Sequence, residues 1–194
     1  MGKHSKPATS ADNGDVIPDR VWRRMLDALD LEPGMSVLEI GTGTGHTAAL
    51  LAEAGALVTT VETVPELAAA ASAALPRADV ADRITVITGP LEKGAPDHAP
   101  FDRVISTTGA HTIPPAWIEQ TKEGGRIVVP YTGPEYPGAL LALTVAEGTA
   151  TGGATTAAHP QRGKHLKTRH PAPAGPLNRL HMTATPTSQT ITFT

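Results

Sequence analysis

The chain has 194 residues, of which 40% are hydrophobic and only 3% aromatic, and it contains no cysteine. We therefore expect one domain with a core of small aliphatic side chains. The composition excludes a disulfide scaffold, a thiolate metal site and a cysteine nucleophile. The scarcity of aromatic rings and the net charge of −3 argue against a nucleic-acid partner.

Acidic residues are confined to one part of the chain. All 19 lie at or before Glu147, together with 11 Lys and Arg, so this part carries a formal charge of −8. The remaining residues hold five Lys and Arg and no acid, a charge of +5. This break predicts a flexible N-terminal arm over 1–15, a folded domain over 16–148 and a divergent, weakly ordered C-terminal region over 149–194.

The sequence also bears on location and on metals. No apolar run reaches the roughly 18 residues that span a bilayer, and no apolar segment follows the positive charges at the N-terminus. Together with the lack of cysteine, these features favour a cytoplasmic protein without a membrane segment. The histidines of the C-terminal region lack the spacing of a metal site, so we expect no metal.

Helical and strand patterns alternate along the acidic part. Pro18 opens a helical pattern that ends at Glu32–Gly34, and further helices are predicted over 46–54, 65–75 and 115–121. Short apolar strands are predicted over 36–40, 57–61, 84–87, 101–106, 126–129 and 140–145. The alternation predicts an α/β fold, with a mainly parallel sheet and helices on both faces.

The pattern decays after Gly148. Loop or disorder over 149–188 is the favoured interpretation, and a divergent final hairpin is the alternative. Residues 189–193 alternate in a way that fits an edge strand.

The sharpest signal is a glycine-rich turn after the first strand. Glu39 is followed by Gly41, Gly43 and Gly45 at alternate positions, and a helix follows. Glycine permits positive φ and a close approach of the backbone to a ligand. A dinucleotide-binding turn places its third glycine one position later, where this chain has His46, so an NAD-dependent oxidoreductase is disfavoured.

A second acid completes the pattern. Glu62 ends the second strand about 20 residues beyond the first glycine, where a carboxylate can accept hydrogen bonds from both hydroxyls of a ribose. The combination is typical of S-adenosylmethionine binding, with Glu39 serving the amino-acid end of the cofactor. The cofactor would also contact the turn and the start of the helix, at Gly41, Thr42, Gly43, Gly45 and His46. A helix-cap role suits His46 equally well.

The stretch VLEIGTGTGHTAALL over 37–51 resembles the cofactor motif of the protein-L-isoaspartate O-methyltransferases. The resemblance covers about 16–147 and includes Val61-Glu62, APFDRVI over 99–105 and WIEQTKEGGRIVVP over 117–130. It implies a Rossmann-like class I methyltransferase fold. It also implies transfer of a methyl group from S-adenosylmethionine to an aspartyl or isoaspartyl carboxylate of a protein or peptide.

A carboxylate is already ionised at neutral pH, so the reaction needs alignment of the acceptor more than a strong base. In this fold the loop after the fourth strand faces the methyl group. The resemblance therefore implies acceptor-side roles for Thr107, Thr108 and His111, and a cofactor contact at Gly89. Each of the three acceptor-side residues also fits an ordinary loop position.

The sequence departs from the family pattern at two positions. Val16 stands where the family has a serine near the acceptor, and we expect the family's N-terminal portion before it to be largely missing. Pro90 stands where the family has the acid that accepts from the adenine amino group. A protein that binds the cofactor without turnover and a small-molecule O-methyltransferase are therefore the alternatives. The sequence does not set the oligomeric state.

Overall fold

The computed structural model describes residues 17–75, 80–132, 138–155 and 180–193. The predicted N-terminal arm lies outside these residues. The helices in the described ranges are α1 (Asp19–Leu29), α2 (His46–Glu53), α3 (Pro65–Ala74) and α4 (Pro115–Glu119). The strands are β1 (Ser36–Ile40), β2 (Leu57–Glu62), β3 (Ile84–Thr88), β4 (Phe101–Ser106), β5 (Thr121–Tyr131), β6 (Ala139–Ala146), β7 (Thr149–Thr155), β8 (Leu180–Ala184) and β9 (Gln189–Phe193). None of the described helices is long and apolar enough to cross a membrane.

The strands form one sheet in the order β3-β2-β1-β4-β5-β6-β7-β8-β9. Neighbours are parallel from β3 to β5 and antiparallel from β5 to β9. Ile40 at the end of β1 pairs with Val61 of β2 and with Ser106 of β4. The residues that follow β1, β2 and β4 therefore lie together at one edge of the sheet, where open α/β sheets bind ligands.

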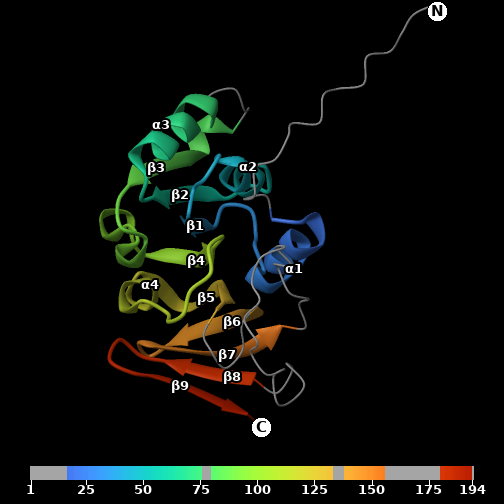
Figure 1. The fold of residues 1–194 in the computed structure, drawn as a ribbon, viewed down its shortest axis with the longest axis vertical. Coiled ribbons are helices and arrows are strands. Elements are labelled where there is room, and N and C mark those ends of the chain that lie inside the picture. Colours follow the sequence, from blue (N-terminus) through green and yellow to red (C-terminus); the bar gives the residue numbers. More distant parts are fainter. Residues whose placement is uncertain (1–16, 76–79, 133–137, 156–179, 194) are drawn as a thin grey trace, which may run out of the picture.

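Buried side chains of the parallel strands supply a core on each face of the sheet. Val37 belongs to a cluster that contains the buried residues Met25 of α1 and Leu51 of α2. The next residue, Leu38, belongs to a second cluster, which contains Trp117 of α4. Figure 1 shows α1 and α2 on one side of the sheet and α4 on the other. The predicted α/β class with helices on both faces is confirmed.

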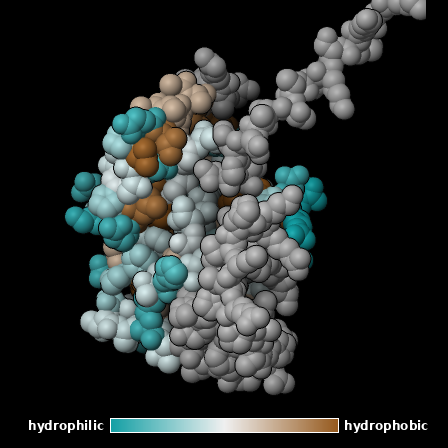
Figure 2. Space-filling model, in the orientation of Figure 1, coloured by the Kyte–Doolittle hydropathy of each residue, from teal (hydrophilic) through white to brown (hydrophobic). Residues whose placement is uncertain are grey.

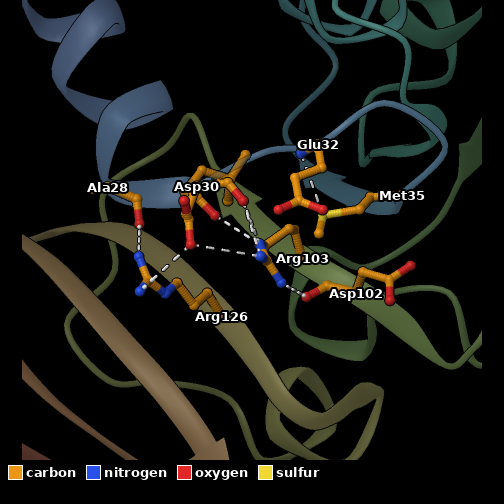
Figure 3. Close-up of polar contacts among 8 residues, drawn as sticks. Ala28, Asp30, Glu32, Met35, Asp102, Arg103 and Arg126 are labelled. Atoms are coloured by element: carbon orange, nitrogen blue, oxygen red, sulfur yellow. Dashed lines mark hydrogen bonds and ion pairs between the residues drawn. The ribbon is translucent and has the colours of Figure 1, made fainter.

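Two arginines hold the C-terminal end of α1 against the sheet (Figure 3). The guanidinium of Arg103 on β4, 9% exposed, donates to the carbonyl oxygen of Leu29 at 2.6 Å and to that of Asp30 at 2.8 Å. Arg126 on β5 donates to the Ala28 carbonyl oxygen at 3.1 Å and lies 3.6 Å from the Asp30 carboxylate. A helix end leaves such carbonyls without partners, so these contacts fix α1 relative to β4 and β5.

The sequence prediction is wrong in two respects. The sheet is mixed rather than mainly parallel, because each strand from β6 to β9 runs antiparallel to the one before it. Loop or disorder over 149–188 is wrong at Thr149–Thr155 and Leu180–Ala184, which form β7 and β8. The strand β7 contains Gly152 because a Cβ at this position would collide with the Ala142 carbonyl oxygen of β6. Glycine is not typical of a strand interior, so the sequence pattern does not indicate a strand here.

The predicted edge strand over 189–193 is confirmed as β9. The division of the chain into an arm, a methyltransferase domain and a C-terminal region stays a prediction.

Candidate functional site

The glycine-rich turn follows β1 at the carboxyl edge of the sheet. Gly41, Gly43 and Gly45 have φ values of 94°, 53° and 79°, in the left-handed region that other residues enter at a cost. The Gly41 N–H donates to the Val61 carbonyl oxygen at 2.9 Å, and the Gly45 N–H donates to the Thr42 carbonyl oxygen at 2.9 Å. The hydrogen bond of Gly41 joins the turn to β2, and the turn leads into α2. The positive φ values at alternate positions explain why glycine recurs at every second residue.

Glu62 ends β2 and reaches across to this turn. Its Oε2 accepts a hydrogen bond from the Gly43 N–H at 2.9 Å, and its Oε1 accepts one from the Val64 N–H at 3.1 Å. A carboxylate has about four lone-pair sites, so acceptor capacity remains for a ligand. The backbone on both sides therefore holds the Glu62 carboxylate in place.

Glu39 on β1 is fully buried. Its exposed fraction is 0%, and neither carboxyl oxygen has a hydrogen bond within the described part of the chain. The neighbouring Thr60 hydroxyl is engaged with the Thr42 hydroxyl at 2.7 Å. Burial raises the pKa of Glu39 to about 8, the Thr60 hydroxyl opposes this shift, and the charge of Glu62 adds to it. A buried carboxyl without a partner is unfavourable, and a cationic ligand group would relieve it.

The loop after β4 packs against the glycine turn. The Thr107 N–H donates to the Ile40 carbonyl oxygen at 3.0 Å, and the Thr107 hydroxyl donates to the Gly41 carbonyl oxygen at 2.7 Å. A Cβ built on Gly41 would lie 2.8 Å from the Thr108 Cγ2 atom. The Thr107 hydroxyl therefore supports the turn, while Thr108 is exposed beside it.

Gly89 joins the same edge, because its N–H donates to the Glu62 carbonyl oxygen at 2.9 Å. Within the described part of the chain, no atom beyond the adjacent residues lies within 4 Å of a Cβ built on Gly89 or on Gly43, so both glycines border open space. His46 and His111 are exposed, and neither side chain has a hydrogen bond or ion pair within residues 17–75, 80–132, 138–155 and 180–193.

The structure thus gathers most of the residues predicted for the cofactor and two of those predicted for the acceptor at one edge, and it leaves the two histidines exposed. The gathered residues are Glu39, Gly41, Thr42, Gly43, Gly45, Glu62, Gly89, Thr107 and Thr108. The roles of these residues stay predictions.

Two features near Glu62 are missing from the sequence analysis. Val64 and Leu67 are 42% and 43% exposed, and Figure 2 shows hydrophobic surface in the region of α3. Exposed apolar side chains beside a carboxylate suit a ligand that has an apolar face. The other feature is Thr60, whose buried hydroxyl lies beside Glu39 and contacts the Thr42 hydroxyl. A hydroxyl residue within a buried strand is the sequence feature that could have indicated it.

A sequence model of the family described as protein-L-isoaspartate(D-aspartate) O-methyltransferase matches residues 16–143, which is more than half of the chain. The chain belongs to the protein-L-isoaspartate O-methyltransferase family.

Curated members of this family align over part of their length. The protein-L-isoaspartate O-methyltransferase of Hyperthermus butylicus is 46% identical over 116 residues, which cover 55% of this chain and 48% of that protein. The enzyme of the same name from Aeropyrum pernix is 39% identical over 155 residues, 78% of this chain and 58% of that protein. The chain spans about half the length of the curated relatives it matches.

Solved structures agree with the family assignment. A protein-L-isoaspartate O-methyltransferase superimposes with a TM-score of 0.67 at 25% identity, over 88% of this chain and 53% of that one. A Plasmodium falciparum β-aspartate methyltransferase in complex with S-adenosyl-L-homocysteine superimposes with a TM-score of 0.55 at 18% identity, over 64% of this chain and 63% of that one. This second likeness concerns the fold alone. The predicted Rossmann-like class I methyltransferase fold is confirmed.

Proposed function

We propose that this chain binds S-adenosylmethionine at the glycine-rich turn and methylates the carboxylate of an aspartyl or isoaspartyl residue in a protein or peptide. The observation that carries the proposal is the buried carboxyl of Glu39, which has no hydrogen-bond partner among the residues that the structure describes. Glu39 lies on the strand that leads into the glycine turn, and Glu62 accepts a hydrogen bond from that turn. Membership of the family supports the reaction class.

The residues present fit this cofactor. Glu62 keeps acceptor capacity for two ribose hydroxyls, and Glu39 offers a buried carboxyl to the cationic amino-acid end. The space beside Gly43 and Gly89 admits a ligand close to the backbone, and Val64 offers apolar surface to one face of a base. We therefore assign Glu39, Glu62 and the glycine turn to cofactor binding.

S-adenosylmethionine, when bound, supplies an electrophilic methyl group on a positively charged sulfur. The chain has to hold the acceptor carboxylate in line and keep water away from it. The acceptor is ionised at neutral pH, so no side chain has to remove a proton. We propose that Thr107 holds the glycine turn in place and that Thr108 and His111 contact the acceptor.

Transfer of a tritiated methyl group to an isoaspartyl peptide tests the proposal, with the aspartyl peptide of the same sequence as the control. We expect transfer to the isoaspartyl peptide, together with binding of S-adenosylhomocysteine in calorimetry. Absence of binding would overturn the cofactor assignment.

One second candidate is a protein that binds the cofactor without turnover, because Val16 stands where the family has a serine near the acceptor. Binding of S-adenosylhomocysteine without transfer to any peptide would support this candidate. Transfer to a small carboxylic acid in place of a peptide would assign a small-molecule O-methyltransferase. The cytoplasmic location stays a prediction from composition.

A further inference from the structure

A single side chain of the C-terminal hairpin holds the loop on the acceptor side. Gln189 is the first residue of β9 and lies 76 positions beyond Ile113. The Gln189 Oε1 accepts a hydrogen bond from the Ile113 N–H at 3.0 Å, and the Gln189 Nε2 donates to the Ile113 carbonyl oxygen. One side-chain amide therefore pairs with both polar backbone groups of Ile113, as an adjacent strand would.

This pairing meets a requirement of burial. Ile113 has an exposed fraction of 0% and belongs to the core cluster of α4. Buried backbone N–H and C=O groups need hydrogen-bond partners. Within the described part of the chain, Gln189 is the residue that supplies both. The position of Ile113 thus depends on a residue of the terminal strand.

The other end of the same loop segment is fixed by β5. The Ala110 N–H donates to the Pro130 carbonyl oxygen at 2.9 Å, and the Thr132 N–H donates to the Ala110 carbonyl oxygen at 2.9 Å. His111 and Thr112 lie between Ala110 and Ile113, and both are exposed. The two residues between Ala110 and Ile113 are held at both ends and have little backbone freedom. These two sets of hydrogen bonds, which we call the clamps, therefore restrict the backbone position from which the His111 side chain extends.

The clamp comes from outside the stretch that the family model matches. That match ends at residue 143, whereas Gln189 lies on β9. The turn before Gln189 is itself held, because the Thr185 N–H donates to the Ser188 carbonyl oxygen at 2.7 Å. Figure 1 shows the turn of the β8–β9 hairpin on the same side of the molecule as α4. The hairpin is therefore placed to act on the loop that enters α4.

We propose that Gln189 is a positioning residue for the methyl acceptor: by clamping Ile113 it fixes His111 on the acceptor side, which makes the β8–β9 hairpin a working part of the acceptor site. The inference rests on the proposed function, since an acceptor site exists only if the chain transfers methyl groups.

Steady-state methyl transfer to the isoaspartyl peptide tests the role of Gln189. For Gln189→Ala we expect kcat/KM for the peptide to fall about tenfold through a higher KM, with the Kd for S-adenosylhomocysteine changed less than twofold. Gln189→Glu keeps the acceptor for the Ile113 N–H, so its kcat/KM should lie between those of wild type and Gln189→Ala. Thr190→Ala, on the exposed side of the same strand, is the control and should match wild type. Equal losses of peptide and cofactor affinity would overturn the proposal.

A double-mutant cycle checks that Gln189 acts through His111. If it does, Gln189→Ala should lower kcat/KM by less than twofold in a His111→Ala background, although it costs about tenfold alone. Fully additive losses would contradict the proposed connection.

Amide hydrogen exchange tests the clamp without any turnover. We expect exchange of the Ile113 N–H, which donates to Gln189, to be at least tenfold faster in Gln189→Ala, and exchange in β1 to be unchanged. Unchanged exchange of the Ile113 N–H would overturn the proposed role of Gln189. If wild type binds S-adenosylhomocysteine but methylates no peptide, the proposed reaction fails, while the exchange result still decides whether Gln189 positions the loop.

Discussion

The Glu62 carboxylate accepts a hydrogen bond from the Gly43 N–H at 2.9 Å, and this bond joins the end of β2 to the glycine turn that follows β1. The second oxygen of Glu62 accepts from the Val64 N–H at 3.1 Å. The Glu62 carboxylate therefore shapes the turn and presents acceptor atoms at the same time, so both the turn and the binding of a ligand should depend on it.

Substitution of Glu62 should weaken cofactor binding. The amide introduced by Glu62→Gln would place an N–H group against one of two backbone donors, so we expect the Kd for S-adenosylhomocysteine to rise by roughly tenfold to a hundredfold. Calorimetric titration measures the effect. Glu66→Gln, an exposed residue in the first turn of α3, removes the same charge and should leave Kd unchanged. Equal affinities of both variants and wild type would refute the ribose contact.

The buried carboxyl of Glu39 should make stability depend on pH. Its pKa is about 8 in the folded protein against 4.5 as the ordinary value, so between these values the folded state holds a proton that the unfolded state releases. Stability is therefore fully present below the lower pKa and is lost as pH rises from the lower pKa through the upper one, on the order of 5 kcal/mol in all. Urea unfolding of wild type at a series of pH values measures this loss.

Glu39→Gln should abolish that part of the pH dependence, because the amide does not titrate. Glu53→Gln, an exposed residue at the end of α2, is the matched control and should keep it. If wild type and Glu39→Gln show the same slope over this range, Glu39 is ionised in the folded protein and the expectation is wrong.

The two glycines of the turn should differ when replaced by alanine. A Cβ on Gly41 would lie 2.8 Å from Thr108 and 2.9 Å from Thr107, at a φ of 94°, so Gly41→Ala should cost at least about 2 kcal/mol of stability. A Cβ on Gly43 would enter open space, so Gly43→Ala should cost about 1 kcal/mol. Thermal unfolding measures both. Loss of S-adenosylhomocysteine binding by a folded Gly43→Ala protein would support the proposed position of the ligand, and unchanged affinity would contradict it.

Arg103 should be important for stability rather than for chemistry. Arg103→Met leaves the carbonyl oxygens of Leu29 and Asp30 without their donor inside the protein, which should lower the free energy of unfolding by about 3 kcal/mol. Arg126→Met affects a side chain that is 38% exposed and should cost less than about 1 kcal/mol. Denaturant unfolding measures both values. An equal cost for the two variants would show that burial of the Arg103 contacts is not decisive.

Much of the parallel half of the sheet can be predicted from the sequence. The strands Ser36–Ile40 and Phe101–Ser106 have the predicted bounds, since a short segment rich in apolar residues, with glycine or proline nearby, marks a buried strand. The positions of Glu39, Glu62 and the glycines at one edge follow from the parallel order. Local pattern therefore suffices where a strand is buried on both faces.

The rest depends on contacts between distant residues. β7 contains Gly152 because the backbone of β6 approaches it, and a sequence of Thr, Ala and Gly does not reveal such an approach. Gln120 is similar: its Oε1 accepts from the Ala95 N–H at 2.8 Å and its Nε2 donates to the Lys93 carbonyl oxygen at 2.8 Å. No spacing rule links Gln189 to Ile113 either, because the two residues meet only after the sheet has formed.

The strand order has a consequence for how the chain reaches this structure. β5 and β6, β6 and β7, and β8 and β9 are neighbours in both sequence and space, whereas Val37 of β1 must find Arg103 of β4 across many intervening residues. Pairing of nearby segments is fast and closure of long loops is slow. The antiparallel ladder should thus assemble early, and the pairing of β1 with β4 should form last during refolding.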